Sequence, residues 1–131
     1  MIHLAGAGTE ARLSLNQLAR EAEAPPAFLS KVLQQLVRTG FVLSHRGKRG
    51  GFSLAPRPQP PTLLDIVDAL EGLPPLNDCL KSEGQCARHT WCGAHVVWLE
   101  AQARMREVLA GATLDMMVAT TARRRAMAGR P

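Results

Sequence analysis

The stretch Gly40-Phe-Val-Leu-Ser-His-Arg-Gly-Lys-Arg-Gly-Gly-Phe-Ser-Leu54 decides the fold of this chain. Residues 41–44 and 52–54 alternate between apolar and polar side chains, which is the period of a β-strand. The residues between these runs, 45–51, are basic and rich in glycine, so we predict a β-hairpin with a basic tip. The tip residues that could approach a ligand closely are Arg46, Lys48, Arg49, Gly50 and Gly51.

Two short helices are predicted immediately before this hairpin. Ser14 and Gln17 form a capping-box pattern that begins a helix over 15–23. Pro25-Pro26 ends that helix and suits the first turn of a second one over 27–39. The apolar residues of this second helix recur along one stripe. They are Phe28, Leu29, Val32, Leu33, Leu36 and Val37, and the opposite face carries Ser30, Lys31 and Gln34.

Two helices followed by a hairpin are typical of a winged helix-turn-helix, so we predict a mainly α fold with a small β-hairpin. In that arrangement the second helix lies in the major groove of DNA, where Gln34 could bond adenine and Lys31 could donate to guanine or phosphate. Cations at the hairpin tip suit phosphates or the minor groove, and its glycines permit close approach. Ser14 completes the candidate DNA-binding residues. The alternative is a small helical domain with a solvated basic loop.

Charge and composition agree with a DNA-binding protein. The 131 residues carry a formal net charge of +5. Residues 1–60 hold eight Lys or Arg against three Asp or Glu, whereas residues 61–131 hold eight of each. The basic excess therefore lies in the half with the predicted helices and hairpin, as expected where a protein faces a polyanion.

We find no paired catalytic carboxylates, nucleophile–base pair or phosphate-binding loop, so we expect no enzyme. No stretch could span a bilayer, and we expect a cytoplasmic protein.

Three cysteines follow a proline-rich linker and a short helix capped by Thr62 and Asp65. Cys79, Cys86 and Cys92 have the spacing C-x6-C-x5-C, and His95 lies three residues further on. Clustered cysteines in a reducing compartment favour a metal site. An iron–sulfur cluster and zinc both accept such ligands, and the spacing alone does not choose between them. A thiol switch and three unrelated cysteines are the other readings.

At this point the sequence resembles the IscR/NsrR family of iron–sulfur winged helix-turn-helix transcriptional regulators. The resemblance rests on Leu13-Ser-Leu-Asn-Gln-Leu-Ala19, Phe28-Leu-Ser-Lys-Val-Leu33, the hairpin stretch 40–54, Asp65-Ile-Val-Asp-Ala-Leu-Glu-Gly72 and Cys92-Gly-Ala-His-Val-Val-Trp98. It covers roughly residues 1–118. Members of that family carry further residues before this point, so the first helix is expected to be truncated here.

The resemblance implies a transcriptional repressor that senses nitric oxide, redox or iron status. Cys79, Cys86 and Cys92 would ligate the cluster with His95 as the fourth ligand, and 2Fe–2S is favoured over 4Fe–4S, with zinc as the alternative metal. A zinc-stabilised or cluster-free regulator and a small electron carrier are the other functions considered. A homodimer would bind an inverted-repeat operator in double-stranded DNA. The expected organisation is a DNA-binding domain (1–57), a linker and helix (58–75), a cluster-binding loop (76–95), a dimerisation helix (93–118) and a mobile basic tail (119–131).

Overall fold

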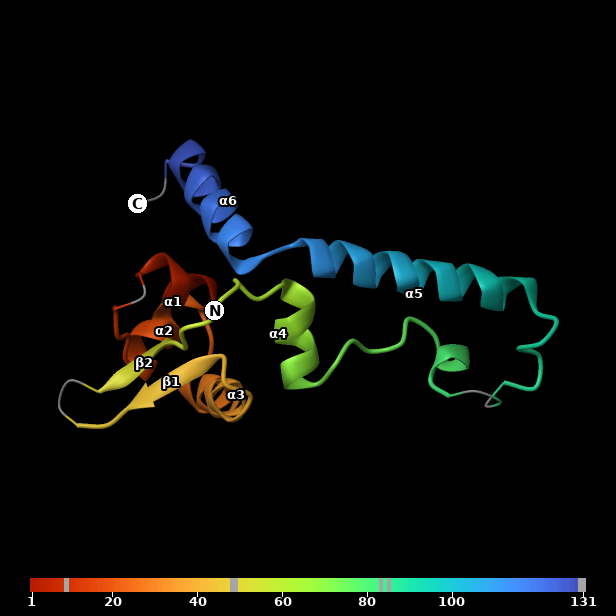
Figure 1. Ribbon diagram of the computed structural model, residues 1–131, viewed down its shortest axis with the longest axis horizontal. Helices are drawn as coiled ribbons and strands as arrows, with labels where there is room; N and C mark the ends of the chain where they lie inside the picture. Colours follow the sequence, from red (N-terminus) through yellow and green to blue (C-terminus); the bar gives the residue numbers. More distant parts are fainter. Residues whose placement is uncertain (9, 48–49, 83, 85, 130–131) are drawn as a thin grey trace.

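A computed structural model describes residues 1–8, 10–47, 50–82, 84 and 86–129 of the chain. In chain order the elements are α1 (Ile2–Gly6), α2 (Leu15–Glu21), α3 (Pro26–Arg38), β1 (Val42–His45), β2 (Gly51–Leu54), α4 (Leu63–Leu70), the 3-10 helix η1 (Asp78–Leu80), α5 (Gly93–Gly111) and α6 (Leu114–Met127). Helices α1 to α3 and the hairpin form one body (Figure 1). The segment after α4 runs away from this body, α5 returns to it, and α6 lies above α1.

The two predicted helices of the helix-turn-helix are present, with the expected signals at their ends. The Ser14 side chain accepts from the Gln17 backbone N–H, and the Gln17 side chain accepts from the Ser14 backbone N–H at 2.8 Å. Gly40 follows α3 with a φ of 73°. The Phe41 N–H then donates to the Leu36 carbonyl at 2.8 Å, which is the pattern of a Schellman motif. Local chemistry therefore fixes both ends of the helix-turn-helix.

The predicted hairpin is also present. Strands β1 and β2 pair antiparallel with Val42 opposite Leu54 and His45 opposite Gly51. Phe52 additionally exchanges backbone hydrogen bonds with Leu13, at 2.8 and 2.9 Å, so the segment before α2 is attached to the edge of the hairpin. The mainly α fold with a two-stranded antiparallel wing is thus confirmed.

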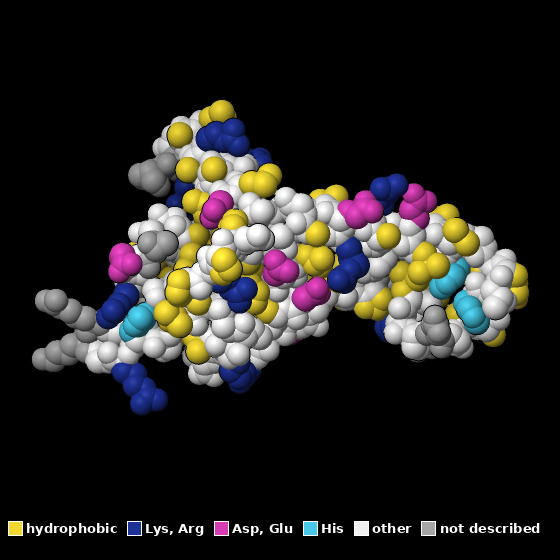
Figure 2. Space-filling view, viewed as in Figure 1, with side chains coloured by type: hydrophobic (Ala, Val, Ile, Leu, Met, Phe, Trp, Pro, Cys, Tyr) yellow, Lys and Arg dark blue, Asp and Glu magenta, His cyan; other side chains and the backbone are white. Residues whose placement is uncertain are grey.

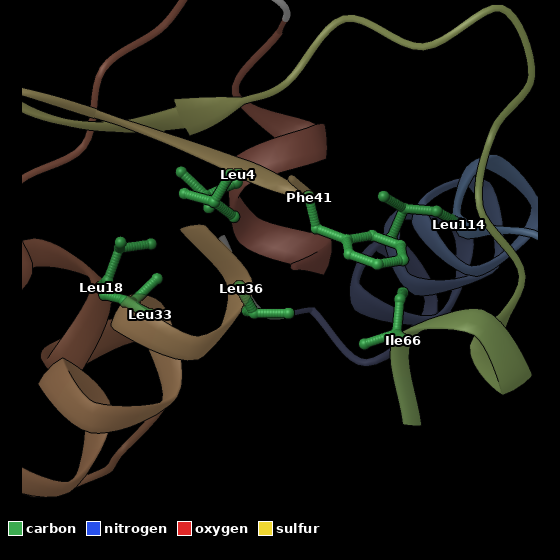
Figure 3. Packing of buried hydrophobic residues seen from close by; sticks show 8 residues of the cluster. Leu4, Leu18, Leu33, Leu36, Phe41, Ile66 and Leu114 are labelled. Carbon is green, nitrogen blue, oxygen red and sulfur yellow. The ribbon is translucent and has the colours of Figure 1, made fainter. Parts of the chain in front are cut away.

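The core joins residues that are far apart in the sequence. Figure 3 shows the Phe41 side chain pointing toward Leu114 at the start of α6 and Ile66 of α4. The fully or nearly fully buried cluster consists of Leu4, Leu18, Leu33, Leu36, Phe41, Val42, Ile66 and Leu114. Because α4 and α6 each contribute to this cluster, the body that carries the wing is completed by the C-terminal half of the chain.

The C-terminal half differs from the sequence-based prediction in two ways. Within the segment 93–118 the sequence indicated a helix to about Ala110 and one last turn from Thr113, but a full second helix begins there, since Ala112 is extended and the Thr113 side chain accepts from the Met116 N–H. The predicted tail over 119–131 is helical as far as Met127. The weak periodicity of this segment has a physical reason, since α6 buries only Leu114 completely.

A short backbone bridge holds the break between α5 and α6 in place. The Leu114 N–H donates to the Pro61 carbonyl, and the Leu63 N–H donates to the Ala112 carbonyl, each at 2.8 Å. The start of α4 is fixed at the same point, because Thr62 and Asp65 form the predicted capping box. The linker, α4 and the α5–α6 joint therefore meet at one place against the body that carries the wing.

Candidate nucleic-acid interface and metal centre

The polar face of α3 is available at the surface, as the sequence predicted. Lys31 and Gln34 are exposed and lie three residues apart, so their side chains are neighbours on the helix. Ser30 is half-buried at the edge of this face. Arg38 is turned toward its own helix, because its guanidinium Nε donates to Gln35 Oε1 at 3.1 Å. The face can therefore offer an ammonium and an amide to base edges.

The wing carries a second group of candidate contacts. Arg46 is exposed, while Lys48 and Arg49 lie outside the described residues. Lys and Arg side chains are visible at the end of the molecule that the hairpin forms (Figure 2). A β-carbon at Gly50 would lie 2.4 Å from the His45 carbonyl oxygen, so this turn has no room for a side chain. The Gly50 N–H donates to the Gly47 carbonyl at 2.8 Å, so the described residues on either side of the tip lie close together.

Two residues of this half, Ser14 and Arg57, make contacts that stabilise the fold. The Ser14 hydroxyl is engaged in the helix cap, where it also donates to Gln17 Oε1 at 2.8 Å. Arg57, which the sequence did not single out, has its guanidinium carbon 3.9 Å from the centroid of the Phe41 ring and donates to the Gly40 carbonyl at 3.1 Å. A cation stacked on an aromatic face is attracted by the ring quadrupole, so Arg57 fastens the linker to the end of α3.

The three cysteines lie at the far end of the molecule from the wing. Cys79 is in η1, Cys86 is in the following loop and Cys92 is the residue before α5; all three are free thiols and half-buried. Cys79 and His95 line one hollow of about 420 Å³ together with His89. The other described residues that line it are Leu80, Ser82, Gly84 and Leu99. Within the described ranges, no three Cys, His, Asp or Glu side chains stand in metal-binding geometry.

The two histidines of this hollow carry the strongest sign of a ligand site. Their ring centroids are 6.2 Å apart with the rings edge to face, and Figure 2 shows the histidine side chains together in this lobe. His89 Nδ1 lies 2.8 Å from the Cys86 carbonyl, which can only accept, so Nδ1 carries the proton and Nε2 is free to bind. His95 Nδ1 is buried without a hydrogen-bond partner. A buried nitrogen left unpaired is costly unless something binds it.

The donor types at this end fit a metal or an iron–sulfur cluster. Thiolate and imidazole are ligands for zinc and for iron–sulfur centres. His95, whose Nδ1 is buried without a partner, lines the same hollow as Cys79, whereas the other two predicted ligands, Cys86 and Cys92, are not among the described residues that line it. Nearby, the hydrogen bond and charge of Lys81 lower the pKa of Asp78 in η1, so its carboxylate stays ionised beside Cys79.

Comparison with known proteins identifies the family. Residues 1–120 match the Rrf2 family, described as "Iron-dependent Transcriptional regulator". The chain belongs to the Rrf2 family. The Rrf2 protein of Nitratidesulfovibrio vulgaris is 28% identical over 118 residues, which are 89% of this chain and 79% of that protein. A putative HTH-type transcriptional regulator of Aquifex aeolicus is 29% identical over 108 residues, covering 81% of this chain and 75% of its own length.

Solved structures of Rrf2 relatives have the same fold. The structure of CymR, the global cysteine regulator of B. subtilis, superposes with a TM-score of 0.70 at 28% identity and covers 91% of this chain and 87% of its own. The structure of T. potens IscR gives a TM-score of 0.71 at 28% identity, covering 92% of this chain and 78% of its own. The winged-helix fold and the resemblance to IscR-type regulators are therefore confirmed.

Membership of the Rrf2 family establishes a DNA-binding transcriptional regulator and confirms that the chain is not an enzyme. It leaves the signal open, because relatives include both IscR proteins and a global cysteine regulator.

Among the described residues, no helix is long and apolar enough to cross a membrane. The structure adds that the wing and the cysteine-bearing lobe lie at opposite ends of this member of the Rrf2 family (Figure 1).

Proposed function

We propose that this Rrf2 protein is a homodimeric cytoplasmic repressor whose affinity for DNA depends on an iron–sulfur cluster. The cluster would be held by Cys79, Cys86, Cys92 and His95, with 2Fe–2S favoured. The observation that carries this proposal is the buried Nδ1 of His95, which has no hydrogen-bond partner, in a residue that lines one hollow with Cys79. When bound, a cluster would supply a centre sensitive to nitric oxide, oxidants or iron supply.

On the DNA side, Ser30, Lys31 and Gln34 of α3 would face base edges in the major groove. Wing residues Arg46, Lys48, Arg49, Gly50 and Gly51 would approach phosphates or the minor groove, with Ser14 at the start of α2 close to the backbone. Arg57 supports this arrangement because it fastens the linker to the C-terminal end of α3. The expected binding is strongly salt-dependent, since phosphate contacts release counterions.

The proposed dimer rests on the surface of α5. Four aliphatic side chains on this helix are exposed although each would be more stable away from water. They are Val96, Val97, Leu99 and Val108. A second copy of the chain, with its own α5 crossing this one, would cover them. Two copies would then present two α3 helices to the half-sites of an inverted repeat.

Side-chain contacts connect the cysteine-bearing lobe with α3. Gln102 of α5 accepts from the Leu76 N–H at 2.8 Å, which ties α5 to the segment that leads into η1. Arg106 of α5 lies 3.4 Å from the Asp68 carboxylate of α4. The Gln35 side chain of α3 donates to the Ala69 carbonyl of α4 at 3.1 Å. A rearrangement of the loop between Cys79 and Cys92 would therefore be transmitted through α5 and α4 to the recognition helix.

The test is anaerobic purification followed by visible absorption, iron and acid-labile sulfide measurements. We expect a coloured protein with about two iron and two sulfide per chain, the composition of a 2Fe–2S centre. Cys92→Ser should abolish the colour, and His95→Ala should shift the absorption bands or lower the iron content. His3→Ala, a histidine on α1, serves as the matched control and should leave both unchanged. A colourless protein with one bound zinc would overturn the sensing proposal and leave a zinc-stabilised regulator.

The coupling is tested separately with Gln35→Leu, which removes the hydrogen bond from the α3 side chain to the Ala69 carbonyl of α4. This variant should keep the wild-type spectrum and iron content. The ratio of its DNA affinities with and without the cluster should fall toward one, because the two sites are coupled only through contacts that differ between their states. An unchanged ratio would show that Gln35 does not transmit the change.

A further inference from the structure

Phe28 of α3 is exposed, which its place in the sequence pattern did not predict. Its spacing placed it on the apolar stripe, yet the residue is 62% exposed. The stripe is filled without it, since Leu33 and Leu36 are buried and Leu29 and Val32 pack against the core. A phenylalanine in this position adds little to the packing of the folded chain, so its exposed ring is available to a partner.

The location of Phe28 indicates which partner that is. It is the third residue of α3, and the N-terminal residues of a recognition helix contact base edges. Lys31 follows three residues later, so the two side chains are neighbours on the helix surface. In the described part of the chain, no aromatic or cation–π contact involves the Phe28 ring. The ring therefore borders the polar face that is proposed to read DNA.

We propose that Phe28 determines operator specificity by contacting the 5-methyl group of a thymine in each half-site. This inference rests on the proposed docking of α3 in the major groove. The thymine methyl is an apolar feature of that groove, and phenylalanine is one of the side chains that contact it. Lys31 and Gln34 recognise hydrogen-bonding atoms, which thymine shares with uracil. A contact from Phe28 to the methyl group would distinguish thymine from uracil, which the polar residues of this face cannot do.

The experiment uses the full-length protein and DNA sites that the wild type selects from a random duplex library. Each thymine of a selected site is replaced in turn by deoxyuridine, which removes only the methyl group. Wild type should lose about fourfold in affinity at one thymine per half-site, the effect of returning one methyl group to water. Phe28→Ala should bind the thymine and uracil versions of that position equally.

Two further variants complete the design. Phe28→Leu keeps an apolar side chain and should retain part of the preference for thymine. Met127→Ala removes a side chain that is 86% exposed at the end of α6, and it should show the wild-type profile. Because Phe28 is exposed, its variants should unfold at the same temperature as wild type, so a loss of preference is not a loss of fold.

The outcomes separate this inference from the proposed function. If wild type and Phe28→Ala give the same uracil profile, the methyl contact is refuted while DNA binding stands. The inference would also be refuted if Phe28→Ala bound every site more weakly and still lost affinity at the same thymine when it is replaced by deoxyuridine. The ring would then add to binding without contacting that methyl group. If wild type selects no DNA sequence at all, the proposed docking of α3 fails and this inference fails with it.

Discussion

Replacing Leu114 with alanine tests whether the C-terminal helix is part of the DNA-binding body. Leu114 is only 1% exposed and packs in the cluster that contains Phe41 and Ile66 (Figure 3). Leucine-to-alanine changes in cores cost about 2–5 kcal/mol, the sum of lost transfer free energy and the cavity left behind. Since Leu114 is almost completely buried in this cluster and its neighbours can close the cavity only partly, we expect a loss of about 3 kcal/mol in the free energy of unfolding.

The measurement is urea unfolding followed by far-UV circular dichroism, at one fixed protein concentration because association would change the apparent stability. The same loss should lower the unfolding temperature by roughly 10 °C for a chain of this size. Met116→Ala is the matched control, since Met116 lies on the same helix and is 58% exposed. It should change the free energy of unfolding by less than about 0.5 kcal/mol. If the two variants unfold alike, α6 does not dock on the core and the reasoning is refuted.

Three other perturbations follow from single contacts. Gly51→Ala should destabilise the wing by about 1–3 kcal/mol in thermal unfolding, because φ is 150° and a β-carbon would lie 2.7 Å from a backbone oxygen; an unchanged melting temperature would contradict this. The hydrogen bond from the Thr62 N–H lowers the pKa of Asp65 below 3.8, so the stability it adds is complete above that pH and is lost as the pH falls through the lower folded pKa. The difference in free energy of unfolding between wild type and Asp65→Asn should accordingly shrink in acid, and a constant difference would argue against the cap. Arg46→Ala should reduce the slope of log affinity against log salt by about 0.9 if one phosphate contact is lost, whereas Arg104→Ala on α5 should leave the slope unchanged.

Much of the DNA-binding half could be predicted because its signals are local. A capping box needs only residues three apart, and both predicted boxes are present, at Ser14 and at Thr62. The glycine after α3 and the alternation on either side of the basic tip likewise report backbone geometry that neighbouring residues determine. The spacing of Cys79, Cys86, Cys92 and His95 suggested a ligand set in the same way, although spacing alone does not identify the metal.

Three features depend on contacts between residues that are far apart in the sequence, and only the tertiary structure decided them. The helix over 114–127 has little periodicity, and it is positioned because Leu114 fills the space beside Phe41 and Ile66. The exposure of Phe28 follows from how α3 rotates against the core, which its own apolar stripe did not specify. The unpartnered nitrogen of His95 is visible only once α5 and η1 are placed side by side. The sequence by itself determined where the helices and the wing begin, because a cap, a turn or a strand gains or loses free energy within a few residues. Which side chains are buried and which are exposed was decided by packing across the whole chain.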